Sequence, residues 1–256
     1  MSSFPFSVGL KLFSTNSQLI PLVQDIQDTG LFGYVELYVL PGTYRENINH
    51  FKHISLPFVI HAPHFGHGVN LANPLLRQNN VKKIEDARRF ADKTGAEYII
   101  VHGGFDGELA EVIEQVGLIG DSRFLLENLP FWGDAGQRCI GSSPDSVSVA
   151  LQSGVFLGFV LDVGHAACAS ASTQSDFLSY LDSFLSLCPK MFHVSDGHLN
   201  SGQDMHLPIG FGDFPWRDIL KRIPDRSMLT METPRDMRFG LADTVNDRHR
   251  IEEIFG

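Results

Sequence analysis

Short apolar runs recur along the whole chain, and most of them give way to a histidine or a carboxylate. Several runs are nearly continuous, as in parallel strands that are buried on both faces. We therefore predict eight strands, over residues 7–13, 34–39, 57–62, 97–102, 123–128, 157–163, 190–195 and 227–232.

Helical patterns fill the intervals between these runs. Residues 74–94 are amphipathic and stop before Gly95, a typical glycine helix end. Ser143 followed by Pro144 indicates a helix start, and that helix should end near Gly154. Three further segments are predicted to be helical, the last only weakly: residues 175–187, 244–254 and 44–52. Strands and helices that alternate without a composition break predict a single-domain (β/α)8 TIM barrel over residues 1–256.

Nine potential metal ligands occupy a shared position in this pattern. They lie at or just past the end of a predicted strand, except for one Asp-x-His pair in a loop: His61, His102, Glu127, Asp162, His165, His193, Asp204, His206 and Glu232. The carboxyl ends of the strands meet on one face of a TIM barrel, where active sites form. Because a charged group that ends a buried strand is costly without a partner, we expect these side chains to share divalent metal ions.

The donor types narrow the choice of metal. Histidine and carboxylate ligands without thiolates suit zinc, with manganese or another divalent ion as an alternative. Zinc with open positions for water needs about three protein ligands, so nine ligands suit three ions with one bridging carboxylate. The four carboxylates carry about −4 and three ions about +6, which leaves a site near +2 that suits a hydroxide and a phosphodiester. A single ion would leave about −2, which favours a neutral polyol.

Composition limits the partners and the compartment. The 256 residues carry a net charge of −10, which argues against strong non-specific binding to nucleic acid. Three cysteines without a C-x-x-C pair indicate reduced thiols and a cytoplasmic protein, with Cys168 expected to be a small buried residue. Residues 1–5 have no signal-peptide pattern, and no apolar stretch has membrane-spanning length. We expect no membrane association and no obligate protein partner.

The ordered motifs resemble endonuclease IV, the second family of AP endonucleases, within the xylose-isomerase-like TIM barrels. The resemblance covers residues 61–232 and includes the segments that carry all nine ligands. It implies three zinc ions: one on His61, His102 and the bridging Glu127, a second on Glu127, Asp162, His193 and Glu232, and a third on His165, Asp204 and His206. The implied reaction is phosphodiester hydrolysis at abasic sites in DNA, with two ions activating a hydroxide and the third stabilising the leaving oxygen.

The chain also resembles the sugar and sugar-phosphate isomerases and epimerases of the same superfamily. That resemblance implies one ion on Glu127, Asp162, His193 and Glu232, with Glu127 and Glu232 as acid and base on either face of the sugar. His165 would then contact the substrate. A metal-binding scaffold without activity is the third class, and an open, convergent site argues against it.

The segment after the second predicted strand departs from endonuclease IV. Those proteins carry an Asn-x-Arg-x-Trp-like stretch that enters DNA, and here only Arg45 is available to replace it. Glu36, within the strand, is similar to the sugar enzymes and is a candidate substrate contact. The alternative is a carboxylate that is hydrogen-bonded at the barrel mouth.

Four further residues are candidate substrate contacts. His64 and Phe65 follow the first ligand and either wedge into a duplex, as the resemblance implies, or cover a small substrate. Trp132 is a substrate wall or a packing residue. Arg235 meets an anionic substrate or pairs with Asp236. Four other histidines have no motif context and are expected on the surface: His50, His53, His198 and His249.

Overall fold

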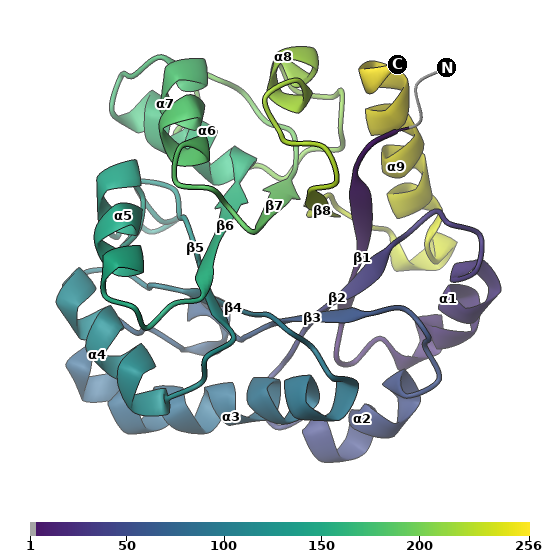
Figure 1. Ribbon diagram of the computed structural model, residues 1–256, viewed down its shortest axis with the longest axis horizontal. Helices are drawn as coiled ribbons and strands as arrows, with labels where there is room; N and C mark the ends of the chain where they lie inside the picture. Colours follow the sequence, from purple (N-terminus) through teal and green to yellow (C-terminus); the bar gives the residue numbers. More distant parts are fainter. Residues whose placement is uncertain (1–3) are drawn as a thin grey trace.

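The eight predicted strands close into one barrel. The computed structural model describes residues 4–256, and its strands are all parallel and follow one another around the barrel in chain order, with β1 beside β8 (Figure 1). The (β/α)8 TIM barrel is therefore confirmed. The strands are Ser7–Phe13 (β1), Tyr34–Tyr38 (β2), Phe58–His61 (β3), Ile99–His102 (β4), Phe124–Glu127 (β5), Gly158–Asp162 (β6), Met191–Val194 (β7) and Met228–Met231 (β8).

Helices surround the barrel and cover the outer faces of the strands (Figure 1). Among the described residues they are Ile20–Ile26 (α1), Tyr44–Phe51 (α2), Arg77–Thr94 (α3), Leu109–Ile119 (α4), Pro144–Gln152 (α5), Val163–Ser172 (α6), Phe177–Leu185 (α7), Trp216–Leu220 (α8) and Ala242–Phe255 (α9). None of them combines the length and apolar character needed to cross a membrane.

The predicted helix signals are present at the helix ends. Gly95 follows α3 in the left-handed conformation, at φ 71°. Ser143 caps α5 through a capping box with Ser146, and Pro144 is the first helical residue. The predicted helix over residues 74–94 differs at its start, because residues 74–76 form a separate 3-10 turn before α3.

The strands present two different faces. Their outward side chains pack with the helices in the main hydrophobic core. Inside the barrel lies a smaller apolar layer, formed by Tyr34, Val59, Ile100, Leu125, Val160 and Met191. Gly9 on β1 leaves room in this layer, because a Cβ atom there would lie 2.4 Å from the Tyr34 ring.

A polar layer lies directly above the apolar one. Side chains on one face of a strand repeat every second residue. The polar position comes two residues after each member of the lower layer, and two residues after Gly9 and Thr230. It lies on the strand in seven cases and just past β8 in the eighth: Lys11, Glu36, His61, His102, Glu127, Asp162, His193 and Glu232. The register of the barrel therefore places eight chargeable groups around its axis, at the carboxyl end of the strands.

Candidate metal centre

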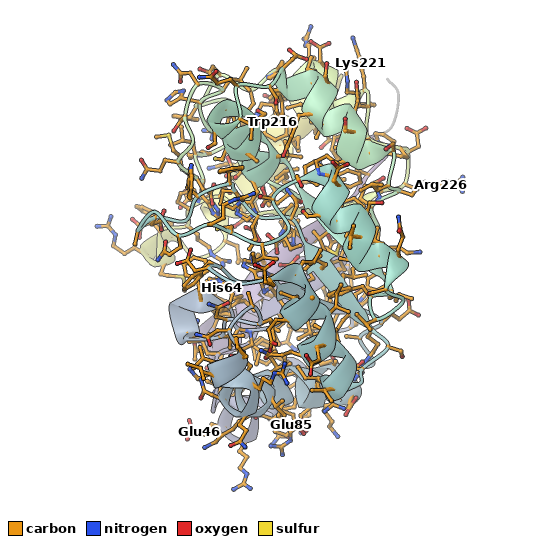
Figure 2. All side chains as sticks on the ribbon, turned by 90° about the vertical axis from the view of Figure 1, so that its left-hand side faces the viewer. Glu46, His64, Glu85, Trp216, Lys221 and Arg226 are labelled. Carbon is orange, nitrogen blue, oxygen red and sulfur yellow. The ribbon has the colours of Figure 1, made fainter. Side chains whose placement is uncertain are left out.

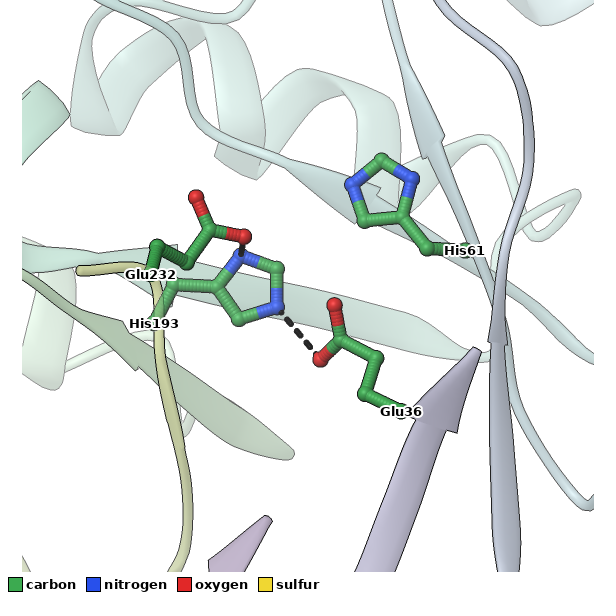
Figure 3. Close-up of side chains that lie close together, drawn as sticks. All are labelled: Glu36, His61, His193 and Glu232. Carbon is green, nitrogen blue, oxygen red and sulfur yellow. Dashed lines mark hydrogen bonds and ion pairs between the residues drawn. The ribbon is translucent and has the colours of Figure 1, made fainter. Parts of the chain in front are cut away.

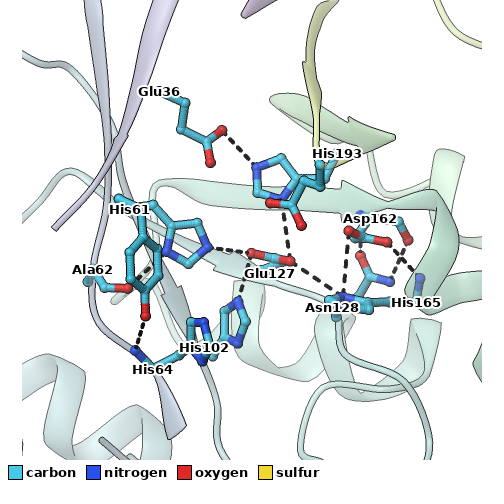
Figure 4. Close-up of polar contacts among 12 residues, drawn as sticks. Glu36, His61, Ala62, His64, His102, Glu127, Asn128, Asp162, His165 and His193 are labelled. Atoms are coloured by element: carbon cyan, nitrogen blue, oxygen red, sulfur yellow. Dashed lines mark hydrogen bonds and ion pairs between the residues drawn. The ribbon is translucent and has the colours of Figure 1, made fainter. Parts of the chain in front are cut away.

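Glu127 lies at the centre of the polar layer and is only 1% exposed. Its Oε2 atom lies 3.1 Å from His61 Nε2 and 2.9 Å from His102 Nε2 (Figure 4). The His61 Nδ1 atom lies 2.8 Å from the Ala62 carbonyl oxygen, a contact in which Nδ1 donates its proton. That bond fixes the ring so that Nε2 is free to bind a metal ion.

The other oxygen of Glu127 faces a second group. Glu127 Oε1 lies 3.3 Å from His193 Nδ1, which is also 3.0 Å from Glu232 Oε1. Asp162, which is 1% exposed, completes this group. The two oxygens of one carboxylate thus point to two different sets of ligands, as in a carboxylate that bridges two ions.

The third group lies where the start of α6, which carries His165, and the loop after β7 approach each other. Asp204 Oδ2 lies 3.3 Å from His165 Nε2 and 2.6 Å from His206 Nε2. His165 Nδ1 donates to the carbonyl oxygen of Asn128 at 2.8 Å, which turns Nε2 toward Asp204. His206 has a positive φ of 50°, a strained conformation of a kind that concentrates at functional sites.

Each of the three predicted ligand groups is therefore assembled. Within each group the potential ligand atoms lie within 4.8 Å of one another. A fourth group, Glu36, His61, His193 and Glu232, meets the same limit (Figure 3). The nitrogen and oxygen donors without a thiolate fit zinc or manganese.

Several buried polar atoms lack a hydrogen-bond partner within the described residues. Asp162 Oδ2 is one of them, and it belongs to the second group. Burial raises the pKa of Asp162 to about 6. Burial would lower the pKa of His206, but its hydrogen bond to Asp204 raises it to about 9. A bound cation would give Asp162 Oδ2 a partner and would favour the ionised form of the carboxylates.

Glu36 has a different place from the one expected of a substrate contact. It is fully buried and lies outside the residues that line the cavity above the barrel. Its Oε2 atom accepts a hydrogen bond of 2.9 Å from His193 Nε2 (Figures 3 and 4). A carboxylate in this position orients a metal-binding histidine. This hydrogen bond fits the alternative for Glu36, a carboxylate hydrogen-bonded at the barrel mouth, and its part in substrate contact stays a prediction.

The cavity above the polar layer has a volume of about 630 Å³. Figure 2 places His64 at this end of the barrel and Arg226, from the loop before β8, at the opposite end. Six predicted ligands line the cavity: His61, His102, His165, Asp204, His206 and Glu232.

Three of the expected substrate contacts line the same cavity. His64 stacks on His102 with a centroid distance of 4.6 Å and an interplanar angle of 12°, so it supports a ligand rather than projecting from the rim. Phe65 is 46% exposed, and Arg235 also lines the cavity. Trp132 is 47% exposed and lies against Phe131, outside the residues that line the cavity.

The sequence analysis did not identify two residues that shape the site, Lys11 and Asn128. Lys11 reaches the layer from β1, where Glu232 and Glu36 are its acidic neighbours. Burial would lower the pKa of Lys11, but these two carboxylates raise it above its ordinary value. Asn128 donates to the Asp162 carbonyl at 3.0 Å and accepts from its backbone N–H at 2.7 Å, which fixes the end of β6. The available signal was the alternation along β1: Gly9 faces the barrel interior, so Lys11, two residues later, faces it too.

The remaining sequence expectations concern single residues. Cys168 is buried in α6, as expected. The four histidines without a motif are exposed, also as expected: His50, His53, His198 and His249.

Comparison with known proteins identifies the family. The model of a family described as "Xylose isomerase-like TIM barrel" matches residues 23–252. The chain belongs to this family. The superfamily resemblance seen in the sequence is thereby confirmed.

Solved structures that resemble this chain include proteins named for both enzyme types that the motifs suggested. The chain superposes on a D-tagatose 3-epimerase-like protein with a TM-score of 0.66 and 20% identity, over 97% of this chain and 96% of the other. It superposes on endonuclease IV from Thermus thermophilus with a TM-score of 0.66 and 23% identity, over 96% of this chain and 99% of the other. At these identities the similarity establishes the fold alone.

One curated relative comes from Methanocaldococcus jannaschii. This uncharacterized protein, MJ1311, is 23% identical over 188 residues, which is 65% of this chain. The match spans only 60% of the relative's length.

Proposed function

We propose that the protein is a metal-dependent phosphodiester hydrolase of the endonuclease IV type, which acts at abasic sites in DNA with up to three zinc ions. The observation that carries this proposal is the divided environment of Glu127. One oxygen faces His61 and His102, and the other faces His193. A single-ion sugar enzyme has no need for the first or the third group.

The residues have distinct tasks in this proposal. Glu127 bridges two groups, while His165 and His206 hold the third beside the cavity. When bound, divalent ions supply a water nucleophile that is acidic enough to ionise near neutral pH and stabilise negative charge on the phosphate. The buried carboxylates Glu127, Asp162 and Glu232 would hold these ions, and the surrounding protein excludes bulk water from most of the polar layer.

The cavity walls supply the contacts to the rest of the substrate. Phe65 offers an exposed aromatic face at the rim, suited to packing against a base or a deoxyribose. Arg235 offers a guanidinium, which suits phosphate. Trp132 is 47% exposed and outside the cavity lining, so in this proposal it would contact an extended substrate such as a duplex.

A second candidate function is isomerisation or epimerisation of a sugar or sugar phosphate with one divalent ion. The observation that favours it is the segment between β2 and α2. Arg45 lies in the first turn of α2 and is exposed, and no other residue of the expected DNA-entering stretch is present. In this alternative Glu127 and Glu232 transfer protons on either side of the substrate.

An incision assay separates the two functions. We expect cleavage of an abasic-site duplex in zinc at low salt, with weak activity at physiological salt. The net charge of −10 opposes DNA binding. With about four phosphate contacts, affinity falls about 100-fold between about 50 and 200 mM salt.

The measurement is an incision rate across a salt series, run beside a screen for turnover of ketoses and their phosphates. An intact duplex and a heat-inactivated protein are the controls. Ketose turnover without incision at any salt concentration would contradict the hydrolase and support the sugar isomerase or epimerase.

Arg235 allows a test of anion recognition. Its Nη2 atom donates to the Lys11 carbonyl at 2.8 Å, whereas its Nε and Nη1 atoms have no hydrogen-bond partner in the described residues. Arg238 is paired with Asp236 and largely exposed, so it is a matched control. We expect Arg235→Met to raise KM for a phosphorylated substrate about 10- to 100-fold, the worth of a charge-assisted hydrogen bond.

The comparison uses KM and kcat for both methionine variants, with thermal melting to verify folding. Equal effects of Arg235→Met and Arg238→Met would remove Arg235 from the substrate site.

A further inference from the structure

Lys11 is the one cation among the eight polar side chains of the layer, apart from any protonated histidine. Its side chain is 18% exposed and lines the cavity. The Nζ atom contacts Glu232 Oε1 and lies 3.3 Å from Glu36 Oε1. Glu36 Oε1 is buried and has no hydrogen-bond partner in the described residues, and the Lys11 ammonium lies 3.3 Å from it.

Those two carboxylates belong to the fourth ligand group. Glu36, His61, His193 and Glu232 offer two nitrogens and two oxygens within 4.8 Å of one another (Figure 3). This set is as suitable for zinc as the three predicted groups. An ion bound there would also take His61 from the first group, and both His193 and Glu232 from the second.

The fourth group therefore competes with the other groups for ligands. An ammonium in contact with both carboxylates supplies the positive charge that a metal ion would otherwise bring. A divalent ion would meet repulsion from this ammonium at short range, in an interior where charges are poorly screened.

We propose that Lys11 is a resident cation that excludes divalent metal ions from the group of Glu36, His61, His193 and Glu232. It is a positioning residue, because it leaves His61 and His193 free for the other groups and leaves Glu36 to orient His193. The proposal rests on the metal centre of the proposed function.

The location of zinc in crystals tests the proposal without reference to activity. Zinc-loaded crystals of the wild-type protein and of Lys11→Met are compared by anomalous scattering at the zinc edge. In the wild type we expect zinc on the predicted groups and none within about 2 Å of a Glu36 oxygen, the zinc–carboxylate bonding distance. In Lys11→Met we expect a zinc ion bound by Glu36.

Two control variants separate charge from other effects. Lys11→Arg retains the cation and should keep the wild-type zinc positions. Lys190→Met removes an exposed lysine before β7 and should do the same. If Lys11→Met does not fold, Lys11→Gln takes its place, and zinc binding is followed in solution by competition with a chromophoric chelator. In this competition assay, adding Glu36→Gln to the Lys11→Gln variant should weaken zinc affinity at the group of Glu36, His61, His193 and Glu232 at least tenfold.

The outcomes are distinct for the two proposals. Zinc on Glu36 in the wild type, or no zinc on Glu36 after Lys11 is neutralised, overturns the role of Lys11. A wild type that binds zinc nowhere, together with a Lys11→Met variant that binds it at Glu36, overturns the three-zinc function and supports the role of Lys11. Zinc in neither protein overturns both.

Discussion

Glu127→Gln is expected to cause the largest loss of activity of any single substitution in the layer, about 1000-fold or more, since each 1.4 kcal/mol of lost stabilisation costs a factor of ten. The amide keeps the size of the side chain but loses the charge that two ligand groups share. His206→Ala removes one member of the third group only, and His206 is more exposed than Glu127. We expect it to reduce activity about 10- to 100-fold and to spare the first two groups.

The measurement is the rate of incision, or of ketose turnover if that is the activity found, with zinc content determined on the same samples. Glu127→Gln should lose more zinc than His206→Ala. A His206→Ala protein with unchanged catalysis and metal content would show that the Asp204 and His206 pair is a loop contact. A Glu127→Gln protein that is no worse than His206→Ala would contradict the bridging role.

Zinc loading is expected to give near three ions per chain and a higher melting temperature. A ligand at about 1000 times its dissociation constant stabilises the folded state by about 4 kcal/mol. For a domain of this size that corresponds to a rise in Tm of about 8–16 °C from one ion alone. The buried groups around Glu127 and Asp162 gain most, because their charges are the least hydrated.

Elemental analysis of protein purified without chelator gives the ion count, and calorimetry before and after chelation gives the change in Tm. Manganese loading is the parallel experiment. A count that stays at one after zinc or manganese loading would exclude the three-ion centre and favour the isomerase.

The sequence predicted the strands well because each is a short buried run that stops at a polar side chain. It predicted that the nine ligands converge on one face, because in a barrel the position along a strand determines which end a residue occupies. Their division into the three groups that the structure assembles was implied by the resemblance to endonuclease IV. Some helices were missed, α4 and α6 among them. The helix α4 has no capping side chain, and α6 is buried on nearly all sides, so it lacks the amphipathic period of a surface helix.

The orientation of side chains within the polar layer was harder to predict from the sequence. A lysine in a strand usually lies toward solvent, and only the barrel register, with Gly9 below it, places Lys11 among the carboxylates. Glu36 was identified, but its burial behind His193 depends on packing from β7, far along the chain. The alternation along β1 indicates that Lys11 faces inward, but the partners of Lys11 and Glu36 are fixed by tertiary contacts.

The shortest seam of the barrel lies between β3 and β4. Only Ile60 with Ile99 and His61 with Ile100 are paired there, whereas β2 and β3 pair over four positions. The first ligand group spans this seam, with His61 on one strand and His102 on the other. An ion held by both histidines would link β3 and β4 where the two strands have the fewest paired positions. Loss of that ion would lower the free energy of local opening between β3 and β4. Metal occupancy would then set how often the barrel opens locally, as well as what it binds.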